Sequence, residues 1–422
     1  MRRGTTSTGL TALALVAALA LAACGRSDDP TAGADADTTT TVGDGPATGN
    51  LTIWAEGAEG DALKDFAVGF TKENPDVKID VTSIPWASAH DKFVTAVAAG
   101  NTPDLAMVGT TWMADFKDAF APVPSDVETG DLFSGALDAD GLALPWYVDT
   151  RVLFYRTDLA KKAGWDSAPT TWDELEQLAS DYQTKAGTKF GMRMPSGGDG
   201  SFRDSLWLPW SNGASLTNSD NTAWTLDSAP MVEAYDYLAS FFTKKISDPD
   251  ADISTGAAEA DFVSGRTPMF VGSPASVSTI ASVGGDGFDS KYATAVLPAA
   301  ESSTSFLGGS NLAVFKKSGN QSSAWKFIEW MLEPAQQVAW YKATGDLPAS
   351  QKAWDDATLS SDAKLAVFGK QLESAEAPPT STSWKEVSVA AEGAVEKIAR
   401  GKQTAAEALK ALQSQAGSIG VG

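Results

Sequence analysis

Cysteine and histidine are almost absent from this sequence. Among 422 residues there is one cysteine, Cys24, and one histidine, His90. A single cysteine cannot form an internal disulfide, and a single histidine leaves no cluster for zinc or for a histidine-dependent catalytic triad. Several classes of enzyme are thereby disfavoured, and we expect neither a metal nor a cofactor.

Basic residues and long apolar runs are also scarce. The 32 lysines and arginines are outnumbered by 54 aspartates and glutamates, which gives a formal net charge of −22 at pH 7. Such a charge repels nucleic acid and anionic lipid headgroups. The apolar stretch from Leu10 to Ala23 is shorter than the roughly 20 residues that a helix needs to cross a bilayer. We therefore expect neither nucleic acid binding nor a transmembrane anchor.

The chain before Cys24 has the features of a secretory signal. Arg2 and Arg3 provide a positive start, the apolar stretch follows, and small residues precede the cysteine. The string LAAC at residues 21–24 resembles a bacterial lipobox, in which the chain is cleaved before the cysteine and the thiol is acylated. We predict a signal peptide over residues 1–23 and a lipid anchor on Cys24 that holds the protein on the extracellular side of the cell membrane. An ordinary cleavage site beside an unrelated cysteine is the alternative.

Residues 24–50 are mostly Asp, Thr, Gly, Ala and Pro, with too little apolar surface to fold, and they predict a flexible linker. From Leu51 onward, strand and helix patterns alternate, with three strands and two helices within about sixty residues. This order favours an α/β fold with a mostly parallel sheet, in which ligands bind beyond the carboxyl ends of the strands. Capping-box spacing at Thr171 and Glu174, and again at Thr404 and Glu407, predicts the start of two later helices.

Six blocks of the chain, in the same order, resemble those of the family 1 extracellular solute-binding proteins, the carbohydrate receptors of ABC importers, which include maltodextrin receptors. These blocks are NPDVKIDV, FVTAVAAGNTPDLAMV, ALPWYVDTRVLFYRTDLAKKAGW, PTTWDELEQLA, FVSGRTPMFVGSPA and GGSNLAVFKKSGNQSSAWKFIEWM. The resemblance implies a monomeric, two-lobed α/β fold of the type II periplasmic-binding-protein kind, with a mostly parallel sheet in each lobe and a hinge of two or three crossings. It implies an N-terminal lobe of residues 51–148 plus 305–350 and a C-terminal lobe of residues 149–304 plus 351–422. It also implies a carbohydrate ligand and an ABC permease as partners.

The resemblance also implies which residues bind the sugar between the lobes. Aromatic rings can stack on the C–H faces of a sugar, while charged and amide groups bond to its hydroxyls. The candidates are Trp54, Glu56, Trp86, Thr111, Trp112, Asp149, Arg151, Phe202, Arg203, Trp207, Ser273, Gly309, Ser310, Asn311 and Trp384. For several of the tryptophans, a place in the core is the competing interpretation, and for Gly309 it is a backbone turn with positive φ. Glu56 is expected to face solvent or ligand.

Two alternatives remain open on the sequence alone. A secreted glycoside hydrolase also needs aromatic surfaces and two carboxylates, for which Glu56 and Asp149 are candidates. The same receptor fold could instead bind a polyamine or a phosphorylated polyol. Where several relatives have a tryptophan after the glycine-proline turn, this chain has Ala275 and Ser276, so one stacking position is in doubt.

Overall fold

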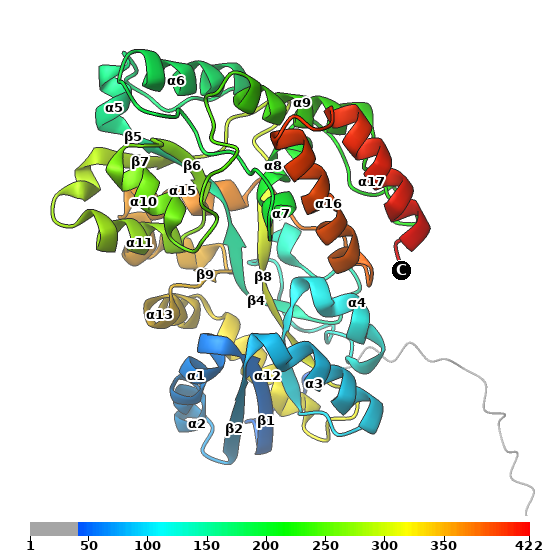
Figure 1. Ribbon diagram of the computed structural model, residues 1–422. Coiled ribbons are helices and arrows are strands. Elements are labelled where there is room, and N and C mark those ends of the chain that lie inside the picture. Colours follow the sequence, from blue (N-terminus) through cyan, green and yellow to red (C-terminus); the bar gives the residue numbers. More distant parts are fainter. Residues whose placement is uncertain (1–40) are drawn as a thin grey trace, which may run out of the picture. The chain divides into compact units, whose positions relative to one another are not determined.

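The computed structural model describes residues 41–422 (Figure 1). The predicted signal peptide of residues 1–23, Cys24 and most of the linker lie outside the described residues. Within residues 41–422, no helix has both the length and the apolar character needed to cross a membrane.

The N-terminal lobe is built on a mixed sheet with the strand order β2-β1-β3-β8-β4-β9. Its strands are β1 (Gly49–Glu56), β2 (Val77–Ile84), β3 (Leu105–Gly109), β4 (Leu144–Thr150), β8 (Ser305–Val314) and β9 (Leu347–Pro348), and β10 (Ala375–Glu376) pairs with β8. The first three strands are parallel because a helix joins each to the next, whereas β8 is antiparallel to β3 and β4 because the chain re-enters from the other lobe. In β1, Leu51, Ile53 and Ala55 are fully buried and alternate with the less buried Thr52 and Trp54.

Helices cover this sheet and join its strands. They are α1 (Gly57–Phe66), α2 (Val68–Glu73), α3 (Trp86–Ala99), α4 (Met113–Phe116), α12 (Gln321–Leu332), α13 (Pro334–Thr344) and α14 (Ala357–Ser360). Trp325 and Trp330 on α12 are buried. Both rings belong to the apolar cluster beneath the sheet.

The C-terminal lobe has more helix than strand. Its sheet contains β5 (Val152–Arg156), β6 (Met269–Gly272) and β7 (Tyr292–Ala295). Its helices are α5 (Thr157–Lys162), α6 (Trp172–Thr184), α7 (Ser201–Ser205), α8 (Trp207–Ser211), α9 (Ala229–Thr243), α10 (Ala257–Ser264), α11 (Ala275–Gly284), α15 (Ala363–Leu372), α16 (Trp384–Ala399) and α17 (Ala405–Ile419). The expectation of a mostly parallel sheet is wrong for this lobe, because β5 pairs antiparallel with both neighbours.

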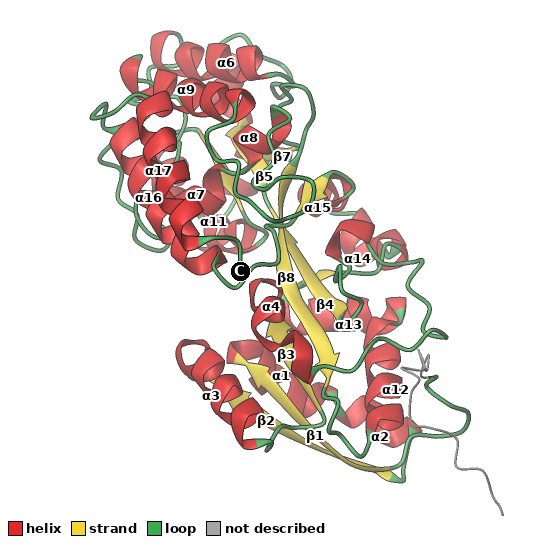
Figure 2. Ribbon diagram, turned by 90° about the vertical axis from the view of Figure 1, so that its right-hand side faces the viewer, coloured by secondary structure: helices red, strands yellow, loops and turns green. Residues whose placement is uncertain are grey.

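The chain passes between the lobes at three places. Strand β4 leads directly into β5 at Arg151, and β8 runs beside β4 in the opposite direction (Figure 2). Thr150 and Ser305 hold these two passages together, since the Thr150 hydroxyl donates to the Phe306 carbonyl at 2.8 Å and the Ser305 hydroxyl donates to the Arg151 carbonyl at 2.7 Å. The third passage lies between α14, which packs near α13, and α15, which packs on β7. It therefore falls about ten residues after the expected boundary at residue 350.

Residues 42–48 are fastened to the N-terminal lobe. The Val42 amide donates to the Asp126 carboxylate at 3.1 Å, and the Thr48 amide donates to the Ser323 hydroxyl at 2.9 Å. Val42 and Ala47 are buried. The expected linker of residues 24–50 thus extends too far at its C-terminal end, because small apolar side chains and backbone hydrogen bonds are enough to hold this segment in place.

Candidate ligand-binding cleft

A cleft of about 1410 Å³ lies between the two lobes and is lined by residues from both. Ten of the fifteen residues expected to bind ligand line it: Trp86, Thr111, Trp112, Asp149, Arg151, Arg203, Ser273, Gly309, Ser310 and Trp384. The other five, Trp54, Glu56, Phe202, Trp207 and Asn311, are not in its lining. The segments just beyond the carboxyl ends of β2 and β3 contribute Trp86, Thr111 and Trp112 to this lining, as expected for an α/β sheet.

The N-terminal wall carries an aromatic group. Trp86 begins α3 and is 39% exposed, and its ring meets that of Trp112 edge to face with centroids 5.5 Å apart. The His90 ring lies 5.3 Å from Trp112, and His90 Nε2 is 2.9 Å from the Asp115 carboxylate. The two indoles therefore offer partly exposed apolar surfaces beside polar groups, among them the neighbouring Thr111.

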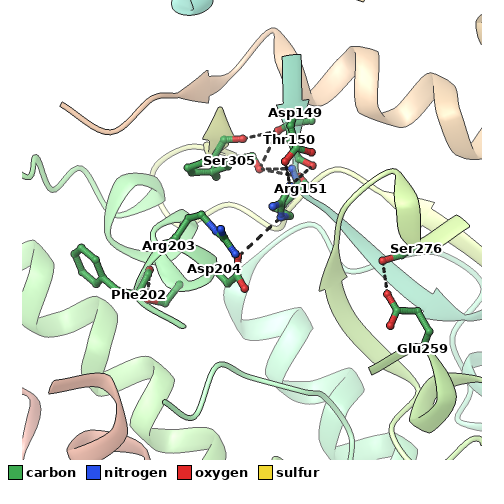
Figure 3. A network of polar contacts seen from close by, with 11 residues as sticks. Asp149, Thr150, Arg151, Phe202, Arg203, Asp204, Glu259, Ser276 and Ser305 are labelled. Atoms are coloured by element: carbon green, nitrogen blue, oxygen red, sulfur yellow. Dashed lines mark hydrogen bonds and ion pairs between the residues drawn. The ribbon is translucent and has the colours of Figure 1, made fainter. Parts of the chain in front are cut away.

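An ion pair lies at the first passage between the lobes. Arg151 Nη1 donates to Asp149 Oδ2 at 2.6 Å, and Arg151 Nε is 4.0 Å from Asp204 Oδ1, which Arg203 also contacts (Figure 3). Burial alone would lower the pKa of Arg151, but the charges of Asp149 and Asp204 outweigh it and the pKa is raised. The guanidinium thus stays charged and fixes Asp149 at the cleft wall.

Tyr147 is a cleft residue that the sequence reasoning missed. It stands two residues before Asp149 on β4, so period-two alternation places both on one face of the strand and could have identified it. The Tyr147 hydroxyl donates to Glu59 Oε1 at 3.3 Å and accepts from the Ser310 hydroxyl at 3.1 Å. Burial, together with the nearby charge of Glu59, raises the pKa of the phenol.

Asp346 is a second missed residue, and it lies between α13 and β9 on the same wall. Burial and the charge of Glu59 raise the pKa of its carboxyl to about 6. One of its oxygens accepts from the Trp340 indole at 3.0 Å. No local sequence signal marks this position, since the bend that brings Asp346 to the cleft depends on the packing of α13.

The C-terminal wall contains Trp384, Arg203, Ser273 and Ala275. Trp384 begins α16 and is only 8% exposed, because its ring packs beside Phe202 and Trp224 with centroids 6.0 Å and 6.3 Å away. Trp384 therefore belongs to the core and to the cleft at once. Ala275 leaves this part of the wall without an aromatic ring.

Glu56 does not face solvent or ligand, contrary to expectation. Its residue is 0% exposed, and within residues 41–422 neither carboxyl oxygen has a hydrogen-bond partner. Burial raises the pKa of this carboxyl to about 8. The last residue of β1 turns into α1 at Gly57, which has φ of +58°, and this turn carries the side chain inside. A hydrolase using Glu56 and Asp149 as its carboxylate pair is thus not supported, because Glu56 is absent from the cleft wall.

The remaining four residues pack within the lobes and do not line the cleft. Trp54 packs edge to face on Phe93, and Phe202 and Trp207 are buried in the core of the C-terminal lobe. Asn311 is buried within β8, where its side chain points away from the cleft lined by its neighbour Ser310. All four were predicted from their position at a strand end or near a helix start, which does not by itself determine the direction of a side chain. Among the described residues, no three His, Cys, Asp or Glu side chains are grouped to hold a metal.

The model of the family described as "Bacterial extracellular solute-binding protein" matches residues 54–338, which is more than half of the chain. The chain belongs to this family. As a solute-binding protein it is similar to the sugar-binding protein MalE from Xanthomonas citri, with a TM-score of 0.82 and 28% identity over 88% of this chain and 97% of that one. This likeness confirms the two-lobed α/β fold that was expected.

Several curated relatives of this solute-binding protein are named for sugars, and others are named only as putative binding proteins. The diacetylchitobiose binding protein DasA of Streptomyces coelicolor is 28% identical over 78% of this chain and 79% of the relative. The maltotriose-binding protein of Pyrococcus abyssi is 24% identical over 83% of this chain and 77% of the relative. The family and these relatives are binding proteins rather than enzymes.

Proposed function

We propose that this solute-binding protein is the carbohydrate receptor of an ABC importer. It captures a mono- or oligosaccharide between its lobes and delivers this sugar to the membrane permease. The protein acts as a monomer and has no enzymatic activity. The observation that carries this proposal is the pairing of partly exposed indoles with fixed hydrogen-bonding groups in one cleft. Trp86 and Trp112 stand on one wall and Trp384 on the other, and Asp149 lines the same cleft.

The groups that line the cleft match the chemistry of a sugar ring. Its C–H faces stack on flat indoles, and its hydroxyls donate to carboxylates such as Asp149 and accept from donors such as Arg203. A hydrogen bond to a charged group contributes about 1.5 to 3 kcal/mol, and a micromolar complex needs about 8 kcal/mol in all. A few such hydrogen bonds together with two or three stacked rings can supply this binding free energy.

Anchoring through Cys24 is part of the proposal. The signal-like residues 1–23 and the lipobox-like string before Cys24 support it. A diacyl anchor would keep the receptor beside its permease on the extracellular side of the membrane. The acidic body would not itself adhere to anionic lipid.

The test is a carbohydrate titration of the protein without residues 1–23, followed by tryptophan fluorescence and thermal unfolding. A ligand present at 100 times its dissociation constant should raise the free energy of unfolding by about 2.7 kcal/mol. Trp112→Ala should weaken binding of that sugar at least about tenfold, whereas Trp165→Ala, outside the cleft, should not. Cleavage of the sugars would contradict the proposal, as would the absence of any response across mono- and oligosaccharides.

A further inference from the structure

A second cavity, of about 210 Å³, lies in the C-terminal lobe beside the cleft. It is formed by the loop of residues 193–200, the first turn of α7, helix α10 and strand β6. Asp199 lines both this cavity and the cleft, so the two spaces adjoin at that residue. Asp204, which lines the second cavity, is the carboxylate that contacts Arg151 and Arg203 on the cleft side (Figure 3).

The walls of this second cavity contain polar atoms that make no hydrogen bond within residues 41–422, although the Arg193 guanidinium also donates through Nη2 to the Asp252 carbonyl. Ser201 is 5% exposed, and within residues 41–422 its hydroxyl has no hydrogen-bond partner. Arg193 Nη1 also has no hydrogen-bond partner in the described chain. The nearest carboxylate, that of Asp261, is 3.9 Å away. An unmade hydrogen bond at a buried donor is costly, and these two donors are available to an occupant of the cavity.

The composition of the cavity indicates the class of that occupant. Asp199, Asp204 and Glu259 line it together with one guanidinium, that of Arg193, so the local charge disfavours a phosphate or carboxylate ligand. Glu259 accepts from the Ser276 hydroxyl at 2.6 Å, which fixes its position (Figure 3). Phe270, Val271 and Ile253 supply apolar surface. A hydroxyl-bearing ring matches all of these, because hydroxyls donate to carboxylates and accept from guanidinium while C–H faces pack on apolar side chains.

We propose that this second cavity is a subsite for one sugar unit of an oligosaccharide whose remainder lies in the cleft. The unit passes beside Asp199 and is held by Ser201 and Arg193. The inference rests on the proposed function and makes it more specific, since a monosaccharide would leave one of the two sites empty. It therefore assigns the protein a ligand of at least two units, extended or branched toward the C-terminal lobe.

The test begins with a defined set of mono-, di-, tri- and branched oligosaccharides on a glycan array, from which the strongest ligand of the unaltered protein is taken. Its affinity is then measured by calorimetry for Ser201→Ala and Ala258→Phe. Ser201→Ala removes a hydroxyl that makes no internal hydrogen bond, so it should leave the thermal midpoint unchanged or higher while weakening the ligand about five-fold. Ala258→Phe, which fills the cavity from α10, should weaken the ligand at least about tenfold.

The matched control is Ala260→Phe, at an exposed position of the same helix, which should bind as the unaltered protein does. A fragment of the ligand that lacks the terminal unit should bind the unaltered protein and both cavity variants equally. Unchanged affinity of both cavity variants for the full ligand would overturn the subsite while leaving the receptor function intact. Failure of the unaltered protein to bind any sugar would instead overturn the proposed function together with the subsite.

Discussion

The carboxyl group of Glu56 is buried at the end of β1 with both oxygens unpaired in the described chain. A folded-state pKa of about 8 means that this group keeps its proton at neutral pH, while the unfolded chain releases it near 4.5. Between these two values the folded protein holds a proton that the unfolded chain does not, so the stability contributed by this group falls as pH rises. Above the folded pKa the loss is complete.

Replacing the carboxyl by an amide should remove this dependence. Glu56→Gln should be similar to the unaltered protein in stability near pH 4.5 and more stable by about 3 to 5 kcal/mol at pH 9, at about 1.4 kcal/mol per pKa unit. Urea unfolding at pH 5, 7 and 9 measures the difference. Glu128→Gln, in an exposed loop, is the control and should change little. Parallel curves for Glu56→Gln and the unaltered protein would contradict the burial argument.

Asp149 connects the cleft to the buried guanidinium of Arg151. Asp149→Asn keeps the shape of the side chain but removes the charge that Arg151 pairs with and that sugar hydroxyls would donate to. We expect sugar affinity to fall about 10- to 100-fold and stability to fall by about 1 to 3 kcal/mol, because Arg151 loses its closest ion-pair partner. Calorimetry and urea unfolding separate the two effects. Asp118→Asn, outside the cleft, is the control. If both variants bind the sugar with the same affinity, Asp149 does not contribute to the binding site.

At the scale of elements, the middle of β8 depends on a backbone that only glycine adopts easily. Gly309 has φ of +128°, and a Cβ there would lie 2.1 Å from the Tyr147 carbonyl oxygen on β4. The pairing of β4 and β8 shifts register at this point, between Pro145 and Tyr147. The backbone conformation at position 309 therefore explains why the residue is glycine, without any role in ligand binding.

Two substitutions of glycine by alanine should act in opposite directions. Gly309→Ala should destabilise the fold by more than about 3 kcal/mol, because the methyl group overlaps the β4 backbone. Gly393→Ala, inside α16 where nothing lies within 4 Å of the new methyl group, should stabilise it by up to about 1 kcal/mol. Thermal unfolding compares the two. Similar midpoints for both variants would contradict the tight approach of β4 and β8.

The elements that could be predicted from the sequence are those with a local cause. The strand pattern that begins at Leu51 predicted β1. The Thr404 side chain accepts from the Glu407 amide in a full capping box, as the spacing indicated. The antiparallel pairing of β5 could not be predicted in this way, because its partners lie more than a hundred residues away in sequence. The same limit applies to the cleft. Period two on β4 could have added Tyr147 to Asp149, whereas the burial of Glu56 depends on a turn whose direction its sequence does not reveal.

At the scale of the whole molecule, three passages join two lobes that share one cleft. A ligand that contacts both walls binds the closed arrangement better than the open one and shifts the population toward closure. Small-angle scattering should therefore record a smaller radius of gyration with a saturating sugar than without it. Asp149→Asn at the same sugar concentration should stay near the unliganded value, and an unchanged radius for the unaltered protein would contradict closure.

The membrane tether is also tested on the whole molecule. Cys24→Ala in a cell that makes lipoproteins should move the protein from the membrane fraction to the medium, because the acyl chains would be missing. The proposed signal of residues 1–23 is unaltered in this variant, so we expect export itself to continue. Ser27→Ala, three residues on, is the control and should stay with the membrane. Full retention of Cys24→Ala would disprove the lipid anchor.

The last residues of the chain support a wall that they do not line. Val421 is buried, its carbonyl accepts from the hydroxyls of Ser381 and Ser383, and the Gly420 carbonyl accepts from the Trp224 indole at 2.7 Å. Ser381 lines the cleft, and Trp224 packs on Trp384. An affinity tag at residue 422, or removal of that residue, should therefore disturb the C-terminal wall of the cleft and alter ligand binding. A purification tag on this solute-binding protein is better placed elsewhere.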